Sequence, residues 1–319
     1  MIGWLAIAIL LAGVIVLEFG LRWRFGFGNP PLYIGDEEIG YLLKPRQKVR
    51  RMGNRIEINE YSMRGNSVPQ SRDAGEFRVF LIGDSVANGG WWTDQSEIIS
   101  ELIKQQLETQ GFKSVRVFNA SANSWNPRNE AAYLRRFGLF ESQVLVVLLN
   151  TDDLFGTPPT ALPVGRDRTY PDKKPRFALI ELYQRSLPRS EPSPELQAIH
   201  QEGGDRVGKN LAALEEMQQL ASQQQAHLIL ALTPLLRELG EPGSRDYEKT
   251  ARQRLQAFCQ QQEITYIDFL PIFQQREYPG TVFRDHIHLS SLGNQVVSEV
   301  LSSAIIDFQH QATSNPNSP

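Results

Sequence analysis

The chain has 319 residues, of which 22 % are charged and 41 % hydrophobic, and its formal net charge is −3. This length is enough for one large domain or two small ones with a sizeable core, and the composition is ordinary for a globular protein. The small net charge gives no reason to expect a nucleic-acid partner. A single cysteine, Cys259, excludes an intrachain disulfide and any metal site built from several cysteines.

The N-terminal segment is apolar enough to enter a membrane. Its first 17 residues carry no charged side chain, Glu18 follows, and the apolar character resumes through Leu21. A membrane span needs roughly 17–25 such residues. Trp4 and Trp23 bracket the segment as interfacial anchors do. We therefore expect residues 1–21 to form one uncleaved transmembrane helix, with a cleaved signal peptide as the alternative.

The side of the membrane is a separate question. Basic residues follow the apolar segment closely: Arg22, Arg24, Lys44, Arg46, Lys48, Arg50 and Arg51. By the positive-inside rule they would hold the rest of the chain in the cytoplasm. They can equally contact anionic headgroups or form a solvated face, so the pattern alone leaves the side open.

The rest of the chain divides into three parts, the second of which contains an insertion. Residues 22–75 contain a Gly-Asn-Pro-Pro turn and short β-like pieces such as 55–59, which is typical of an arm or linker. A main domain is expected over 76–310. Within it, 154–204 is rich in proline and charge and is either a lid or substrate-facing wall, or a tolerated surface insertion. The polar tail, 311–319, is expected to be disordered.

Five apolar runs rich in β-branched residues recur in the main domain, over 77–82, 115–118, 144–149, 227–232 and 264–267. Helical patterns separate most of them, over 94–110 with Thr93 or Asp94 as a cap, around 211–220, over 247–262 and over 292–305. Strands that alternate with helices predict an α/β fold with a five-stranded parallel sheet covered on both faces. Cys259, in the third of these helices, is expected in the core.

Polar residues of catalytic type follow the ends of these strands. The first strand is followed by Asp84 and Ser85, the second by 119–124, the third by 150–153, and the fifth by Asp285 and His288. Sites of open parallel sheets form beyond the carboxyl ends of the strands, so we expect these residues to converge.

Three of these residues match the needs of acyl transfer. A serine hydroxyl is a weak nucleophile that needs an adjacent base, which His288 can supply to Ser85. Asp285, three residues earlier, can orient the imidazole and stabilise its charged form. A metal site made from Asp285, His286 and His288 is the competing interpretation, disfavoured because no further His or Cys ligand is near in sequence. We expect neither a metal nor an organic cofactor.

With these motifs the chain resembles the SGNH/GDSL hydrolase family, over roughly residues 77–306. The resemblance implies a flavodoxin-like three-layer α/β/α sandwich, Ser85 as nucleophile, and Asp285 and His288 as its partners. It also implies ester or thioester substrates of lipids, sugars or acylated polysaccharides, and some members are O-acyltransferases. The segment 58–65 resembles the lead-in of membrane-anchored bacterial members, which favours an extracytoplasmic, periplasmic location against the positive-inside signal.

Two positions depart from the family pattern. Ser124 stands where a glycine normally offers a backbone N–H to the oxyanion. Asp152 stands where an asparagine normally donates from its side chain, and an ionised carboxylate there would repel the oxyanion. Asp152 can be kept protonated by burial and by Asp153. Alternatively Asn150 or Thr151 takes over, or the site is weakened.

The sequence thus predicts a serine-dependent esterase that acts on an ester of a lipid or an acylated saccharide. An O-acyltransferase of a cell-envelope polysaccharide is one alternative, and a non-catalytic binding protein that keeps the fold is another. Trp91 and Trp92, close behind the nucleophile, are candidates for a sugar-stacking platform or for core and lid packing.

Overall fold

The structure of the chain is a computed structural model, which describes residues 1–188 and 191–314. Nine β-strands run over Tyr33–Asp36 (β1), Gly40–Leu43 (β2), Gln47–Arg51 (β3), Asn54–Ile58 (β4), Phe77–Gly83 (β5), Val115–Ser121 (β6), Val144–Asn150 (β7), His227–Thr233 (β8) and Thr265–Asp268 (β9) in this part of the chain. The α-helices of the same residues are Ile2–Gly20 (α1), Ser85–Asn88 (α2), Ile99–Thr109 (α3), Pro127–Phe137 (α4), Ala178–Ser186 (α5), Pro194–His200 (α6), Arg206–Gln223 (α7), Asp246–Gln261 (α8), Phe269–Gln274 (α9) and Ser291–Ser314 (α10).

The central sheet is parallel and has the strand order β6-β5-β7-β8-β9. All five predicted strands are present. Strand β6 continues three residues beyond the predicted end, because Asn119 to Ser121 pair with Leu81 to Gly83 of β5. Strands β5 and β7 are central and buried along their whole length, which agrees with their continuous apolar sequences.

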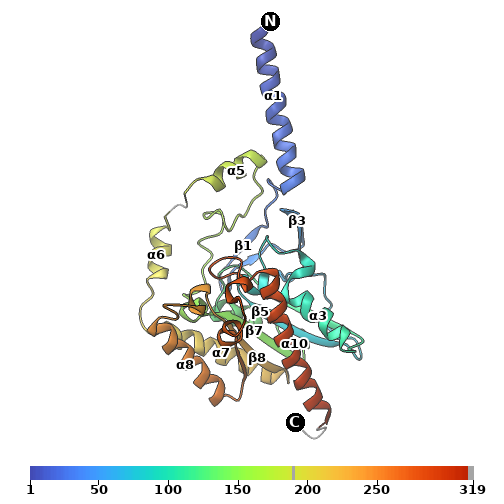
Figure 1. The fold of residues 1–319 in the computed structure, drawn as a ribbon, viewed down its shortest axis with the longest axis vertical. Coiled ribbons are helices and arrows are strands. Elements are labelled where there is room, and N and C mark those ends of the chain that lie inside the picture. Colours follow the sequence, from blue (N-terminus) through green and yellow to red (C-terminus); the bar gives the residue numbers. More distant parts are fainter. Residues whose placement is uncertain (189–190, 315–319) are drawn as a thin grey trace.

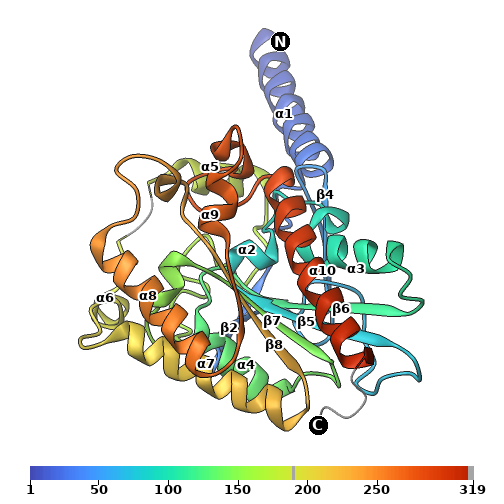
Figure 2. The same ribbon diagram turned by 60° about the horizontal axis from the view of Figure 1, so that its bottom comes forward.

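Successive residues of the strands face opposite sides of this sheet. Phe80 and Ile82 of β5 pack with α4, α7 and α8, whereas Val79 and Leu81 pack with α3, α9 and α10. Figure 2 shows the helices on the two sides of the sheet. The chain therefore has the three-layer α/β/α fold that its strand and helix pattern predicts. Cys259 is buried in the first of these two cores, as expected.

The arm, residues 22–75, is built from two antiparallel hairpins, β1–β2 and β3–β4. Its apolar residues, among them Tyr41, Val49 and Ile58, belong to the same core as Phe80 of β5. The buried Arg64 guanidinium donates to the carbonyls of Asn88, Gly90 (2.5 Å) and Thr93 (2.6 Å). The arm is thereby fixed to the loop that follows the first strand of the sheet.

The N-terminal helix stands apart from the domain (Figure 1). Together with the turn Leu21–Phe25 it forms one continuous helix of 24 residues that is long and apolar enough to cross a membrane. None of the side chains in its most apolar window is buried by the rest of the described chain.

At the opposite end of the chain, α10 continues through Ser314, so residues 311–314 are helical rather than the start of a disordered tail. The remainder of the predicted tail lies outside the described residues.

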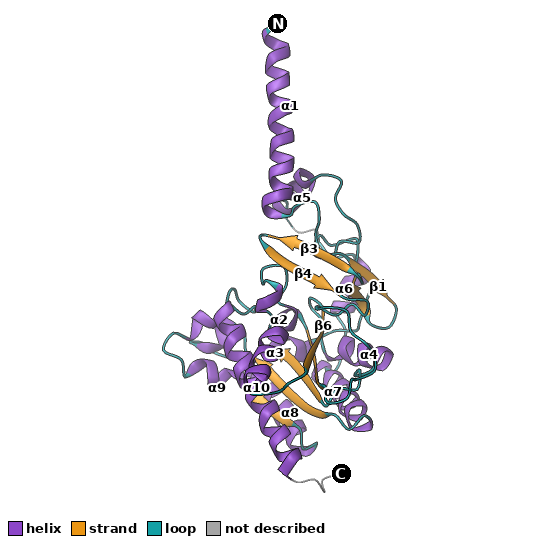
Figure 3. Cartoon of the chain, turned by 90° about the vertical axis from the view of Figure 1, so that its right-hand side faces the viewer, coloured by secondary structure: helices purple, strands orange, loops and turns teal. Residues whose placement is uncertain are grey.

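The insertion, residues 154–204, contains the short helices α5 and α6 and the loop that leads to them. Figure 1 shows α5 beside the inner end of α1, and α6 farther along the domain. The arm hairpins and the insertion lie on the same side of the domain as α1 (Figure 3).

Candidate active site

The first strand of the sheet ends in a tight turn that presents Ser85. Gly83 closes β5 against β7, and a Cβ atom there would lie only 2.4 Å from the Leu148 carbonyl oxygen. Asp84 then caps α2, its Oδ1 accepting the backbone N–H of Val86 (2.7 Å). Ser85 is the first residue of α2, so its hydroxyl lies at the carboxyl edge of the sheet.

The Asp285–His288 turn lies directly opposite this serine. The backbone N–H groups of Ile287 (3.1 Å) and His288 (2.9 Å) donate to Asp285 Oδ1. His288 Nδ1 lies 2.9 Å from Asp285 Oδ2, and His288 Nε2 lies 3.0 Å from Ser85 Oγ. The structure thus brings together three residues that are separated by 200 positions in the sequence.

The charge of Asp285 is set by these contacts. Burial raises the pKa of the Asp285 carboxyl, but hydrogen bonds from the backbone and ring of His288 and from Ile287 outweigh it and hold that pKa below its usual range. The side chain of His286 is 83 % exposed, and its Nδ1 lies 3.8 Å from Asp285 Oδ1. Among residues 1–188 and 191–314, no three or more His, Cys, Asp or Glu residues are grouped to hold a metal ion.

A tryptophan supports the imidazole. The rings of Trp92 and His288 lie 4.4 Å apart, and Trp91 packs edge-on against Trp92. The Arg284 guanidinium lies over both indoles, 4.9 Å from the Trp92 ring centroid. Both tryptophans also line the cavity described below. A sugar-stacking role for them stays a prediction.

Three carboxyl groups are buried behind the serine, on Asp84, Asp153 and Glu130. The Asn150 amide donates to Asp84 Oδ2 and to Asp153 Oδ2, both at 2.9 Å, and so joins two of them. Ser85 Oγ also lies 3.0 Å from Asp84 Oδ2, so the serine hydroxyl has two acceptors within reach. Neither Glu130 oxygen has a hydrogen-bond partner among the described residues. Burial raises the pKa of all three carboxyls.

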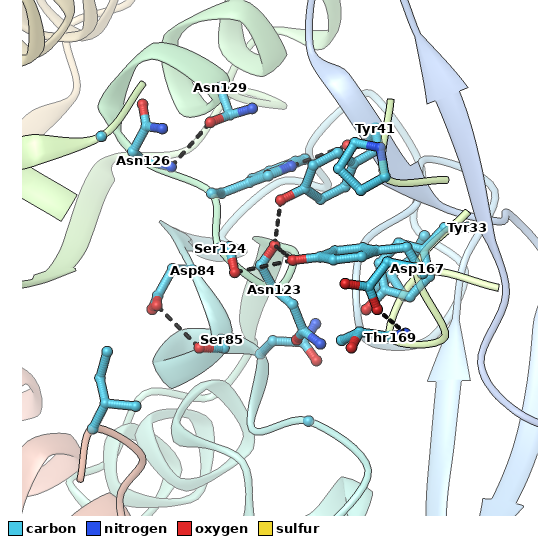
Figure 4. A pocket seen from close by; sticks show the side chains of 18 of the residues that line it. Tyr33, Tyr41, Asp84, Ser85, Asn123, Ser124, Asn126, Asn129, Asp167 and Thr169 are labelled. Carbon is cyan, nitrogen blue, oxygen red and sulfur yellow. Dashed lines mark hydrogen bonds between the residues drawn. The ribbon is translucent and has the colours of Figure 1, made fainter. Parts of the chain in front are cut away.

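Ser124 adopts the conformation that a glycine favours. Its φ of 57° lies in the left-handed region, so the turn keeps its shape without a glycine. The Tyr170 hydroxyl donates to Ser124 Oγ (3.0 Å), and the Tyr41 hydroxyl donates to the carbonyl of Asn123 (2.6 Å). Figure 4 shows Tyr41, Asn123 and Ser124 on one side of the pocket, next to Ser85.

Three residues are candidates for the third donor to the oxyanion: Asp152, Asn150 and Thr151. Their contacts differ. The Asn150 amide is engaged by the two carboxylates, and the Thr151 hydroxyl donates to Glu238 Oε1 (2.6 Å), away from Ser85. Asp152 lines the cavity, and its backbone N–H donates to Asn150 Oδ1 (2.8 Å). Its side chain reaches solvent, yet partial burial raises the pKa of its carboxyl.

The site opens into a cavity of about 810 Å³. The sheet edge contributes Ser85, Ser124, Asp152 and His288 to its lining. The arm contributes Pro30, Tyr33 and Tyr41, and the insertion contributes Pro159, Tyr170 and His200. Sequence reasoning missed the arm and insertion residues of this list, because their tyrosines and prolines follow no motif. The signals were the proline-rich composition of the insertion and the Gly-Asn-Pro-Pro turn of the arm.

The chain matches the sequence model of the GDSL-like Lipase/Acylhydrolase family over residues 81–296, about two thirds of its length, and belongs to this family. Comparison with curated proteins gives no match. The chain is similar to the solved structure of the acetyl xylan esterase AlAXEase, with 14 % identity over 72 % of this chain and 100 % of that one, and a TM-score of 0.49.

Two further solved structures show a comparable likeness. One is a lipase/acylhydrolase from Enterococcus faecalis, with 14 % identity over 72 % of this chain and 95 % of that one, and a TM-score of 0.45. The other is a catalytic mutant of Axe2, an acetylxylan esterase from Geobacillus stearothermophilus. It has 12 % identity over 70 % of this chain and 92 % of that one, and a TM-score of 0.48.

Proposed function

We propose that this chain is a serine esterase in which Ser85, His288 and Asp285 act as nucleophile, base and orienting acid. With its ring proton on Nδ1, His288 donates to Asp285 and accepts the Ser85 proton at Nε2. Ser85 Oγ then attacks the acyl carbonyl, and the protonated imidazole gives its proton to the leaving alcohol. Water, deprotonated by His288, releases the acid from the acyl-enzyme.

One observation carries this proposal. A single imidazole has one nitrogen 3.0 Å from the hydroxyl of Ser85 and the other 2.9 Å from the carboxylate of Asp285. This is the arrangement in which a base deprotonates a serine and is itself held in one tautomer. The lowered pKa of Asp285 supports the assignment, because it keeps the carboxylate ionised beside the ring.

The backbone N–H groups of Ser85 and Ser124 are the proposed donors to the oxyanion. We assign the third position to Asp152 in its protonated form, which donates from its O–H. The raised pKa of Asp152 supports this form, and the engagement of Asn150 and Thr151 by other groups argues against those two as donors.

The substrate we propose is an ester of a lipid or of an acylated saccharide. Aromatic and proline side chains line the cavity beside the amide groups of Asn123, Asn126 and Asn129, so that it offers both apolar contact and hydrogen bonds. If a saccharide hydroxyl replaced water in the second step, the same site would act as an O-acyltransferase.

The proposed organisation places the membrane anchor at residues 1–21, the arm at 22–75 and the hydrolase domain at 76–310. An anchor is supported by the exposed apolar surface of α1, which only lipid or a further partner would cover. We propose an extracytoplasmic location for the domain. By the positive-inside rule, the basic residues after α1 favour the cytoplasm. Two of them form ion pairs within the chain, Arg22 with Glu18 and Arg51 with Glu181.

The test is ester hydrolysis by the full chain in detergent, with chromogenic esters of short, medium and long acyl chains and with acetylated oligosaccharides. Hydrolysis that disappears in Ser85→Ala is the expected result. Acyl transfer to an added saccharide without release of free acid would favour the transferase. A folded chain that binds these esters and turns over none of them would contradict the proposal and favour a binding protein.

A further inference from the structure

The insertion carries an exposed apolar stripe. Phe177, Ile180, Tyr183 and Leu187 recur at intervals of three, three and four residues along α5, which places them on one face. Their exposed fractions are 49, 42, 65 and 43 %, respectively. On the opposite side Ala178 and Glu181 are buried, and Leu182 is 39 % exposed. An exposed stripe of large apolar side chains indicates a surface that something else covers.

Hydrogen bonds fasten α5 to the inner end of α1. The Glu18 carboxylate of α1 accepts the first two N–H groups of α5, from Ala178 (2.8 Å) and Leu179 (3.0 Å). The guanidinium of Arg22, one turn later, donates to the Arg176 carbonyl (2.9 Å). The position of α5 is therefore set by the helix that we propose as the membrane anchor (Figure 1).

A second set of contacts joins α5 to the arm. The buried Glu181 carboxylate pairs with Arg51 and accepts the backbone N–H of Gly28 (2.6 Å). Breaking such a buried pair is costly, so the outward orientation of the stripe is well determined. Arg168, from the loop before α5, donates to the Gln184 (2.9 Å) and Arg185 (3.2 Å) carbonyls at the other end of the helix.

α5 is attached at the end of α1, where the interface of a membrane spanned by α1 would lie. Trp23, 83 % exposed, follows α1 by three residues, and tryptophan is enriched where hydrocarbon meets headgroups. Lys173, Lys174 and Arg176 precede α5, and all three are exposed. A helix with an apolar stripe and adjacent basic residues is typical of segments that lie in the plane of an anionic membrane.

We propose that α5 is an interfacial helix that docks on the anionic surface of the bilayer beside the anchor. The inference rests on the proposed anchor but not on the proposed esterase chemistry. Phe177, Ile180, Tyr183 and Leu187 enter the headgroup boundary, and the lysines contact anionic phosphates. Because Arg185 of α5 also lines the cavity, this part of the cavity lining lies next to the lipid headgroups.

The experiment uses the full chain reconstituted into vesicles of phosphatidylcholine and phosphatidylglycerol. An environment-sensitive thiol label is attached at Tyr183→Cys, and its quenching by spin-labelled lipids is measured. Tyr247→Cys is the matched control, since Tyr247 is also half exposed and lies on α8, far from α1. Val14→Cys reports on the anchor. The native Cys259 does not compete, because burial raises the pKa of its thiol to about 12.

We expect lipid quenching at position 183 to exceed that at 247 several-fold, and to fall when Lys173→Glu and Lys174→Glu are added. Quenching at 14 without quenching at 183 would overturn the proposal while leaving the anchor intact. Quenching at neither position would overturn both. If quenching at 183 stays the same after Lys173→Glu and Lys174→Glu, recognition of anionic lipid by these lysines is excluded. A label at 183 that becomes shielded only as protein concentration rises in detergent would show that a second copy covers the stripe.

Discussion

The two walls of the pocket are built in different ways. The inner wall lies at the carboxyl ends of buried parallel strands, and its groups, such as Ser85, His288 and Asn150, are held by hydrogen bonds at fixed distances. The outer wall comes from the arm and the insertion, whose tyrosines pack into the core and whose prolines line the cavity. The sheet supplies a rigid frame for chemistry, and the added segments shape what reaches it.

The difference predicts a separation of effects. Changes at the inner wall should alter kcat, because they act on groups that interact with the transition state. Changes at the outer wall should alter KM, because they remove contacts that substrate and transition state share. The substitutions that follow test this separation.

The largest effect is expected for the nucleophile. Ser85→Ala removes the atom that attacks the ester, so kcat should fall on the order of 10⁶-fold. Initial rates of ester hydrolysis at saturating substrate measure the change, with circular dichroism as the control for folding. Residual hydrolysis within tenfold of the parent would contradict a serine mechanism.

The next largest effect is expected for the orienting acid. Asp285→Asn removes a charge that the hydrogen bonds of His288 and Ile287 hold in place, and it allows the wrong tautomer of the imidazole. We expect kcat to fall about 10⁴-fold with KM little changed. An equal loss in kcat and gain in KM would mean that Asp285 contributes to binding instead.

Asp152 should respond in a pH-dependent way. Its raised pKa means that the donating, protonated form is lost as pH rises through that pKa. Asp152→Asn supplies a donor at every pH, so the ratio of the variant's kcat to the parent's should increase with pH, by at most about 100-fold, and be larger at pH 8 than at pH 5. The kcat profile of parent and variant between these values is the measurement. A profile that is parallel in both chains would exclude Asp152 from the oxyanion site.

A smaller effect is expected on stability, from Glu130 behind the inner wall. Its carboxyl is buried without a hydrogen-bond partner among the described residues. The pKa of this carboxyl is raised in the folded chain, so its ionisation destabilises the fold as pH rises above the pKa of about 4.3 that it has in the unfolded chain. Glu130→Met should raise the free energy of unfolding by about 1–2 kcal/mol. Urea unfolding near pH 8 and pH 5 should show the larger gain at pH 8. A loss of stability at both values would mean that the carboxyl has a partner that the apolar side chain cannot replace.

The smallest effect is expected at the outer wall. His200 and Leu196, both of α6, belong to the part of the cavity lining that the insertion contributes. His200→Ala and Leu196→Ala should each raise KM about two- to fivefold with kcat unchanged. Steady-state kinetics on a saccharide ester and a lipid ester would show which class depends on this wall. A change in kcat alone would remove the distinction between the walls.

The inner wall was largely predictable from the sequence. Continuous apolar runs fix the five strands, and polar residues at their ends converge because parallel strands share one edge. The contact of Ser85 with Asp84 and the bridge made by Asn150 were not predictable. They depend on side-chain rotamers of a turn whose shape is set by Gly83 against Leu148.

The sequence predicts the insertion as a lid or substrate-facing wall, but the individual contacts of the outer wall were not predictable. The packing of Tyr41 of the arm next to Tyr170 of the insertion depends on how two distant segments fold over the domain, and neither has a local period that encodes it. The same holds for the bonds of Glu18 to the start of α5. In the sequence, Glu18 only interrupts an apolar run, which does not indicate this contact. Such contacts become visible only when the segments are placed in space.

The most direct test of the central claim is covalent labelling of the full chain with a fluorophosphonate, beside Ser85→Ala and His288→Ala. We expect the peptide containing Ser85 to carry the phosphonate, Ser85→Ala to take up none, and His288→Ala to react far more slowly. Equal labelling of all three folded chains, or no labelling of the parent, would contradict an activated serine at this site.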